Sequence, residues 1–212
     1  MEKQVEQLET LTEIRSMMER STRFISLNGL SGVFAGLFAL IGALAAFIYL
    51  QYGSGGHLYY ENAVLQDGSI NVSFYLFLFL DAFLVLFASM AVAISLSVRK
   101  AKKKGLKIWD HSAKRLLINM FIPLLAGGLF CLILIYHGLV GLVAPATLIF
   151  YGLALVNASK YTLNDIRYLG FIQISLGIIA SIWLGYGLFF WAIGFGIVHI
   201  IYGTMMYFKY EK

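Results

Sequence analysis

The stretch FYLFLFLDAFLVLFASMAVAISLSV, Phe74–Val98, decides the kind of fold, and Asp81 is its one charged residue. A helix of this length crosses the roughly 30 Å hydrocarbon core of a bilayer. The run lacks the polar–apolar alternation of a barrel strand, and a helix satisfies its own backbone in lipid, so a transmembrane helix is predicted. An ionisable side chain inside a bilayer is costly, which makes Asp81 the first candidate for a functional residue.

The composition of the whole 212-residue chain agrees with this prediction. The chain is 60% hydrophobic and 13% charged, with a mean hydropathy of +0.80, whereas a soluble domain is about half apolar and about a quarter charged. Apolar runs long enough to span a membrane recur along it. We therefore predict an all-α polytopic protein with one transmembrane domain, 24–212, and six spans, at about 24–50, 74–98, 116–136, 139–156, 166–184 and 188–208.

The basic residues predict the topology of these spans. All 16 Lys and Arg lie before the first run, in 99–115, at the 160–167 connection or at the C-terminal end, and none lies in the other connections. Loops rich in Lys and Arg stay in the cytoplasm, so both ends of the chain are expected there. An odd number of spans would break this segregation.

Residues 1–23 form a separate cytoplasmic segment in this prediction. Val5, Leu8, Leu11, Ile14 and Met18 recur at spacings of three and four, which predicts an amphipathic helix with a narrow apolar stripe. Two interpretations stay open. The helix lies on the inner membrane surface or on the protein's own cytoplasmic side, or it docks a cytoplasmic protein partner.

The stretch EIRSMMERSTRFISLNGLSG, Glu13–Gly32, resembles the opening of small, uncharacterised bacterial polytopic membrane proteins. The resemblance covers about a tenth of the chain. It implies a location in the bacterial inner (cytoplasmic) membrane, and it carries no activity, cofactor or site residues.

The loop after the second run holds the densest positive charge in the chain. Near a membrane surface each basic side chain gains about 1 kcal/mol from anionic lipid headgroups, or the loop is basic simply to remain inside. Nucleic acid is not expected as a partner, because aromatic residues are not interleaved with the charges. The candidate headgroup ligands are Arg99, Lys100, Lys102, Lys103, Lys104 and Lys107.

A paired pattern marks the fifth and sixth runs. GFIQISLG, Gly170–Gly177, and GIVHIIYG, Gly196–Gly203, each read Gly-x-x-polar-x-x-x-Gly, with Gln173 and His199 in the same place. This spacing puts each polar residue on the glycine face of its helix. We expect the two side chains to meet, since a neutral histidine has one donor and one acceptor and an amide serves either. They lock two helices together, or they line a polar pathway.

Asp81 is expected about 10 Å below the outer edge of its helix. Thr147 and Ser181 lie at a similar predicted depth, and Pro145 leaves the Gly141 carbonyl without its helical donor. Three interpretations stay open. In its neutral form Asp81 donates a hydrogen bond to Thr147 or to Gly141, or it binds a proton or cation, or it reaches toward the outer surface.

Small residues on the first span, Ser31, Ala35, Ala39 and Ala43, predict close helix packing and offer a face for a homo-oligomer. Gly29–Gly32 also matches the GxSG tetrapeptide of rhomboid intramembrane proteases, so a Ser31–His199 dyad is a remote alternative. Ser31 lies on the first span rather than the fourth, and the second span has no histidine or asparagine for an oxyanion. No catalytic residue, metal or cofactor is predicted, because the sequence carries no metal or nucleotide motif.

The leading hypothesis is a non-enzymatic membrane protein that binds or permeates a small solute or ion, with a link to protons. Asp81, Thr147, Ser181, Gln173 and His199 would form its site. The alternative is a scaffold or regulatory subunit that acts through the segment 1–23 and the basic loop. A cavity shared by the polar residues would favour the first hypothesis, and a dry, packed interior would favour the second.

Overall fold

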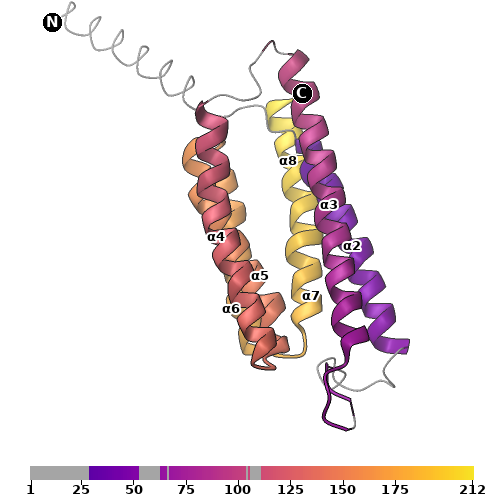
Figure 1. Ribbon diagram of the computed structural model, residues 1–212. Coiled ribbons are helices and arrows are strands. Elements are labelled where there is room, and N and C mark those ends of the chain that lie inside the picture. The colour runs from indigo at the N-terminus through magenta and orange to yellow at the C-terminus, as the bar shows by residue number, and fades with distance from the viewer. Residues whose placement is uncertain (1–28, 53–62, 66, 104, 106–110) are drawn as a thin grey trace, which may run out of the picture.

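The computed structural model describes residues 29–52, 63–65, 67–103, 105 and 111–212, and within them the chain forms a bundle of long helices (Figure 1). The segment 1–23 lies outside the described residues. The α-helices are α2 (Gly29–Tyr52), α3 (Val72–Lys103), α4 (His111–Tyr136), α5 (Val143–Ala158), α6 (Ile166–Ile182), α7 (Gly187–Trp191) and α8 (His199–Tyr210). Short helices η2 (Val140–Leu142) and η3 (Ser159–Tyr161) flank α5, and a π-helix η4 (Ala192–Val198) joins α7 to α8.

The helices confirm the predicted all-α architecture, and their lengths fit a multi-pass membrane protein. Five helical stretches of the described chain are long and apolar enough to cross a bilayer, and the last of them runs continuously from α7 through η4 to α8. The sixth apolar helix, α6, has 17 residues, about 25 Å at about 1.5 Å per residue. The start of α2 and the end of α8 lie at the same end of the bundle (Figure 1), as an even number of crossings requires.

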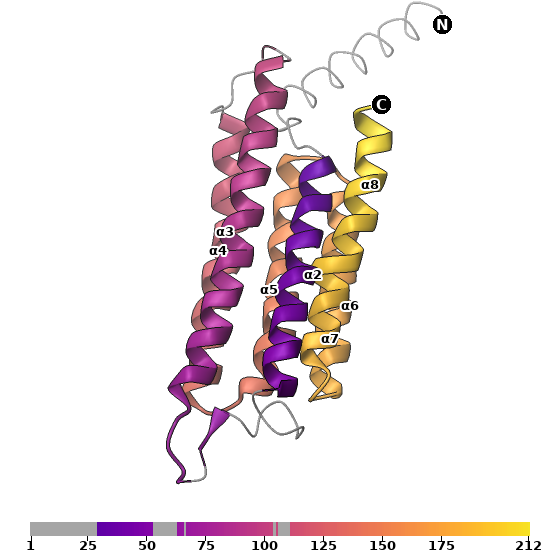
Figure 2. The same ribbon diagram turned by 90° about the vertical axis from the view of Figure 1, so that its right-hand side faces the viewer.

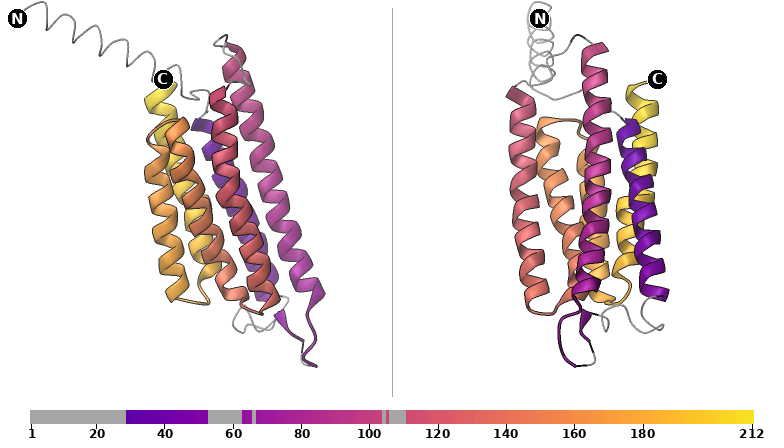
Figure 3. Two further views of the ribbon diagram at one scale, coloured as in Figure 1. Left: turned by 60° about the vertical axis from the view of Figure 1, so that its left-hand side comes forward. Right: turned by 45° about the vertical axis from the view of Figure 1, so that its right-hand side comes forward.

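The bundle consists of two groups of helices that meet at α7 and η4. In one group α4 and α6 both pack on α5, and in the other α3 and α8 both pack on α2. Figure 2 shows α2 alongside α8, and the views in Figure 3 show α4 beside α5. Because α7 contacts α5 and α6 while η4 contacts α2 and α6, this junction connects the two groups.

Glycines allow the closest contacts within each group. A Cβ added to Gly152 on α5 would lie 2.6 Å from the Gly170 carbonyl oxygen on α6. A Cβ on Gly203 would lie 2.6 Å from the Val33 backbone nitrogen on α2. Backbones approach this closely only where no side chain intervenes, which is how helices associate without a hydrophobic driving force in lipid.

Contacts within one chain cover part of the small-residue faces. Gly170 and Gly177 face α5, and Gly203 faces α2, so the two glycine patterns do not pack against each other. The small-residue side of α2 is likewise occupied within one chain, where Ala39 and Ala43 are buried and Gly32 faces Gly203. The periodicity identified the contact faces correctly but not the helices that cover them.

Asn119 and Asn157 connect α4 to α5. Pro123 lies inside α4 and has no N–H, so the carbonyl four residues earlier, at Asn119, lacks its helical donor. The Asn157 side-chain amide donates to that carbonyl at 2.8 Å. A polar side chain on the neighbouring helix thus satisfies the backbone group that the proline leaves free.

The last residues of α8 and the residue after it fasten three other helices, in what we call the C-terminal clamp. The Glu211 carboxylate accepts from the Gly29 backbone N–H at 2.6 Å and pairs with Lys100 at 3.0 Å. Next to it, Asp165 before α6 accepts from Lys209 at 2.7 Å and from the Tyr210 hydroxyl at 2.8 Å. Partial burial opposes ionisation of Asp165, but these two hydrogen bonds outweigh it and hold the pKa of the carboxyl below its usual value.

A cysteine introduced at Gly68 and another introduced at Lys103 are expected to react from opposite sides of the membrane. Gly68 lies four residues before α3 and Lys103 is the last residue of α3, whose 32 residues exceed the thickness of a bilayer core. The measurement is labelling of intact cells or oriented vesicles with a membrane-impermeant maleimide. Reaction of both cysteines from one side would contradict the assignment of α3 as a span.

Candidate functional site

A polar cluster lies where the two groups of helices meet, and it begins with the π-helix η4. A π-helix is rare, and single π turns inside α-helices are frequent at functional sites. The sequence of η4, AIGFGIV, contains Gly194 and Gly196, both buried. Glycines are poor α-helix formers, which makes an irregular turn less costly at this place.

The Gly194 carbonyl oxygen receives two side-chain donors. The Gln173 Nε2 atom on α6 lies 2.7 Å from it, and the His199 Nδ1 atom at the start of α8 lies 2.8 Å from it. Gln173 is 0% exposed and His199 is 6% exposed. The predicted meeting of the two side chains therefore occurs, with Gln173 Nε2 and His199 Nδ1 3.3 Å apart.

The shared carbonyl decides the protonation of the imidazole. A carbonyl oxygen only accepts hydrogen bonds, so the proton of neutral His199 is on Nδ1. Gln173 Nε2 also donates to this oxygen, because the opposite orientation of the amide would place two oxygens 2.7 Å apart. Gln173 and His199 thus present donors to each other, and the Gly194 oxygen, not a direct hydrogen bond, connects them.

Tyr151 on α5 completes the cluster. Its hydroxyl lies 2.9 Å from His199 Nε2, which is the acceptor in this tautomer, so the tyrosine donates. The Phe195 ring stacks on the His199 ring at a centroid distance of 5.8 Å. We call Tyr151, Gln173, His199 and the Gly194 carbonyl the buried polar cluster, and it joins α5, α6, η4 and α8.

Two polar atoms near this cluster have no hydrogen-bond partner among the described residues. One is the Gln173 Oε1 atom, which points at Gly194, where an added Cβ would lie 2.5 Å away. The other is the Tyr202 hydroxyl, one turn along α8 from His199. A buried polar group without a partner is unfavourable by about 1–3 kcal/mol, so each has capacity for a further hydrogen bond.

The sequence did not identify Tyr151 as part of this site. Tyrosine is common at membrane interfaces, so a single tyrosine in an apolar run gives no sign of a buried partner. The π-helix was not predicted either. The closely spaced Gly194 and Gly196 just before His199 could have indicated it, since two glycines weaken an α-helix.

Asp81, Thr147 and Ser181 are not brought together. A Cβ added to Gly42 on α2 would lie 3.3 Å from both carboxylate oxygens, so Asp81 lies between α2 and α3. The Thr147 hydroxyl donates to Ala144 at 2.7 Å, and the Ser181 hydroxyl donates to Gly177 at 2.8 Å, each within its own helix. Their similar depths would have allowed Asp81 to contact Thr147 or Ser181, but the three side chains face different neighbours.

The candidate headgroup ligands of the basic loop differ in whether their side chains are available to lipid. Arg99, Lys102 and Lys103 are exposed beyond the apolar part of α3. Lys100 is only 10% exposed and pairs with Glu211, so it is not available as a free headgroup ligand. Lys104 and Lys107 lie outside the described residues.

The Ser31–His199 dyad does not form in this arrangement. Both imidazole nitrogens are already engaged, Nε2 with Tyr151 and Nδ1 with Gly194, so neither can take a proton from Ser31. Within the described ranges, no group of three or more His, Cys, Asp or Glu side chains is arranged to hold a metal ion.

Fold and site together define a class: a helical, multi-pass membrane protein with a buried, incompletely satisfied polar cluster between its helices. Neither a protein-family model, nor a curated protein, nor a solved structure matches this chain.

Proposed function

We propose that the protein is a six-span protein of a bacterial inner membrane, with both ends in the cytoplasm, that binds a small solute or ion within its bundle. The binding site is the buried polar cluster. The observation that supports this proposal is the Gln173 side chain, which is fully buried while its Oε1 atom has no donor among the described residues. Such an oxygen binds a hydrogen-bond donor or a cation.

His199 Nε2 is the atom of the cluster at which a proton could be added. A proton added at His199 Nε2 would turn this acceptor into a donor, and the Tyr151 oxygen would then accept from it. The Tyr151 O–H would need a new acceptor. The Tyr202 hydroxyl is buried and has no hydrogen-bond partner in the described chain, so we assign it this role.

The proposal places binding at the cluster alone. Asp81 belongs to the contact between α2 and α3, whereas Gln173 and His199 lie at the junction of the two groups. A continuous route through Asp81 is therefore not part of the proposal.

The test is nitrogen NMR of the protein in lipid nanodiscs, with labelled His199 and Gln173 side chains and the other three histidines replaced by glutamine. The probes are protons, over about pH 5 to 8 where histidine ordinarily titrates, and then sodium, potassium and ammonium at constant ionic strength. We expect one probe to shift the His199 ring and Gln173 amide signals together. Gln173→Leu should abolish or displace the His199 response.

Thr204→Val is the matched control. The Thr204 hydroxyl donates to Ile200 within α8 and is exposed to the surroundings of the bundle, so its loss should leave the response unchanged. If no probe moves either signal, or if Gln173→Leu responds like the wild-type protein, the cluster is only a structural clasp.

A scaffold or regulatory subunit is the second candidate, and α3 is the observation that favours it. This helix has 32 residues, packs chiefly on α2 and ends in exposed basic side chains at Arg99, Lys102 and Lys103. At about 1.5 Å per residue it is about 48 Å long, so one end projects from a bilayer core of about 30 Å. A silent cluster in the NMR experiment would support this function.

A further inference from the structure

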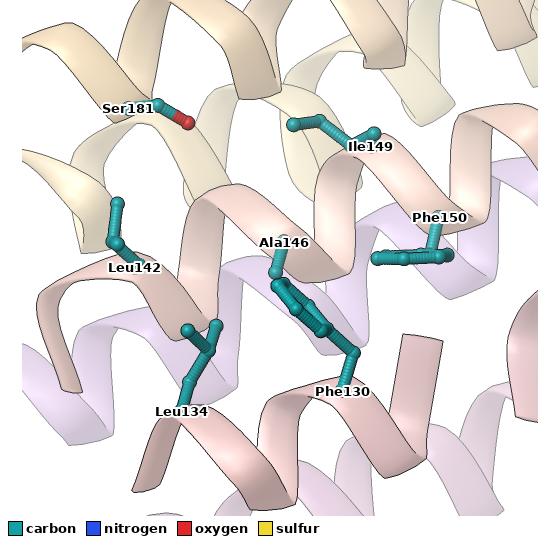
Figure 4. A pocket seen from close by; sticks show the side chains of 7 residues that line it. All are labelled: Phe130, Leu134, Leu142, Ala146, Ile149, Phe150 and Ser181. Atoms are coloured by element: carbon teal, nitrogen blue, oxygen red, sulfur yellow. The ribbon is translucent and has the colours of Figure 1, made fainter. Parts of the chain in front are cut away.

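A pocket of about 200 Å³ lies away from the buried polar cluster, in the notch over α5 between α4 and α6 (Figure 4). Both α4 and α6 pack on α5, which forms the floor. Figure 4 shows the Phe130 ring reaching toward Ala146 from α4 and Ser181 facing the pocket from α6. The other lining residues are Leu134, Leu142, Ile149 and Phe150.

The lining excludes polar ligands. Six of the seven lining residues are apolar, and the seventh, Ser181, already donates its hydroxyl proton to Gly177. A buried polar ligand would find no free donor among these side chains and one acceptor, the Ser181 oxygen, so burying several polar groups there is unfavourable. Apolar cavities of about 150 Å³ lined by Leu, Ile and Phe bind molecules such as benzene, so this pocket is large enough for an apolar group.

The pocket opens toward the lipid-facing surface of the helices. Leu134 and Ala146 are buried at its floor, whereas Phe130 at its edge is 43% exposed. On the two flanking helices, Leu129, Ile133 and Ile178 are more than half exposed and apolar. The mouth is therefore continuous with the surface that lipid covers in a membrane-spanning bundle.

We propose that this pocket binds a segment of the acyl chain of a membrane lipid. Ala146 and Phe150 lie about 4 and 10 Å along α5 from its first residue, Val143. Half of a bilayer core is about 15 Å thick, so the pocket lies beside the part of an acyl chain nearer the headgroup. The tail and not the headgroup is recognised, because the lining offers no charge.

The experiment uses phosphatidylcholine with a photoreactive diazirine on one acyl chain, either near the ester or at the terminal methyl. The full-length protein is irradiated in vesicles of each lipid, and adducts are located by mass spectrometry. We expect adducts at Phe130, Leu134 and Ala146 to be several-fold more abundant with the diazirine near the ester. Leu132 and Ile133, which are exposed on α4 at the same depth, are the control and should give several-fold fewer adducts with the diazirine near the ester.

Ala146→Leu fills the floor of the pocket and should reduce its adducts several-fold, while Ala126→Leu on the exposed face of α4 should not. Should Ala146→Leu fail to fold, Phe130→Ala enlarges the mouth and should increase adducts at Leu134. Equal labelling of pocket and exposed surface, or no response to these changes, would overturn the proposal. A pocket protected from lipid and cross-linked instead to a second copy would also overturn it.

Discussion

Replacing Gly203 by leucine is expected to destabilise the folded bundle more than any other single change considered for this protein. A Cβ at this position would lie 2.6 Å from the Val33 backbone nitrogen and 2.7 Å from the Gly29 carbonyl oxygen. Backbone atoms cannot rotate away as a flexible side chain can, so α2 and α8 must move apart. Overpacking of this kind costs about 1–3 kcal/mol and occasionally more.

The measurement is the free energy of unfolding in mixed micelles, followed by circular dichroism. Gly128→Leu is the matched control, because nothing lies within 4 Å of a Cβ added at that exposed position on α4. This change should not destabilise the bundle and should stabilise it by up to about 1 kcal/mol, because leucine is a better helix former than glycine. Equal stability of the two variants would show that α2 and α8 do not approach as closely as described.

Two double-mutant cycles around His199 are expected to give coupling energies of opposite sign. Tyr151 donates directly to His199, so Tyr151→Phe with His199→Leu should cost less than the sum of the single changes. Gln173 and His199 instead share the Gly194 oxygen and present donors to each other. Gln173→Leu with His199→Leu should therefore cost at least the sum.

The same unfolding measurement gives these energies, which should be modest. Interhelical hydrogen bonds in membrane proteins average about 0.6 kcal/mol and reach about 1.7 kcal/mol. His199→Leu should be the largest single effect in the cycles, since His199 contributes to two hydrogen bonds. If the Gln173–His199 double variant loses less unfolding free energy than the two single variants together, these side chains hydrogen-bond directly, and His199 is not protonated on Nδ1.

Apolar run length was sufficient to predict the helices but not their ends. The run 74–98 became α3, which continues to Lys103 because Arg and Lys are good helix formers and Lys100 pairs with Glu211. The run predicted over 166–184 became α6, which ends at Ile182. The ends of these helices depend on ion pairs and turn residues, which an average hydropathy does not describe.

The candidate site was predicted in part, for a reason that Gln173 and Asp81 illustrate. Spacing along a helix shows which residues share a face, and depth follows from the rise per residue. Gln173 met His199 because both lie near the junction of the two groups. Asp81 has a suitable depth too, but its direction around α3 depends on tertiary packing, which no local pattern determines.

The C-terminal clamp has a consequence for the order in which the protein is assembled. Lys209, Tyr210 and Glu211 follow their partners Gly29, Lys100 and Asp165 in the chain, and synthesis proceeds from the N-terminus. Until α8 leaves the ribosome, the first turn of α2 lacks the carboxylate that accepts its N–H, and the end of α3 lacks its ion pair. The packing of α4 and α6 on α5 and of α3 on α2 needs no residue of the clamp, whereas the clamp itself can form only after Lys209–Glu211 has been synthesised.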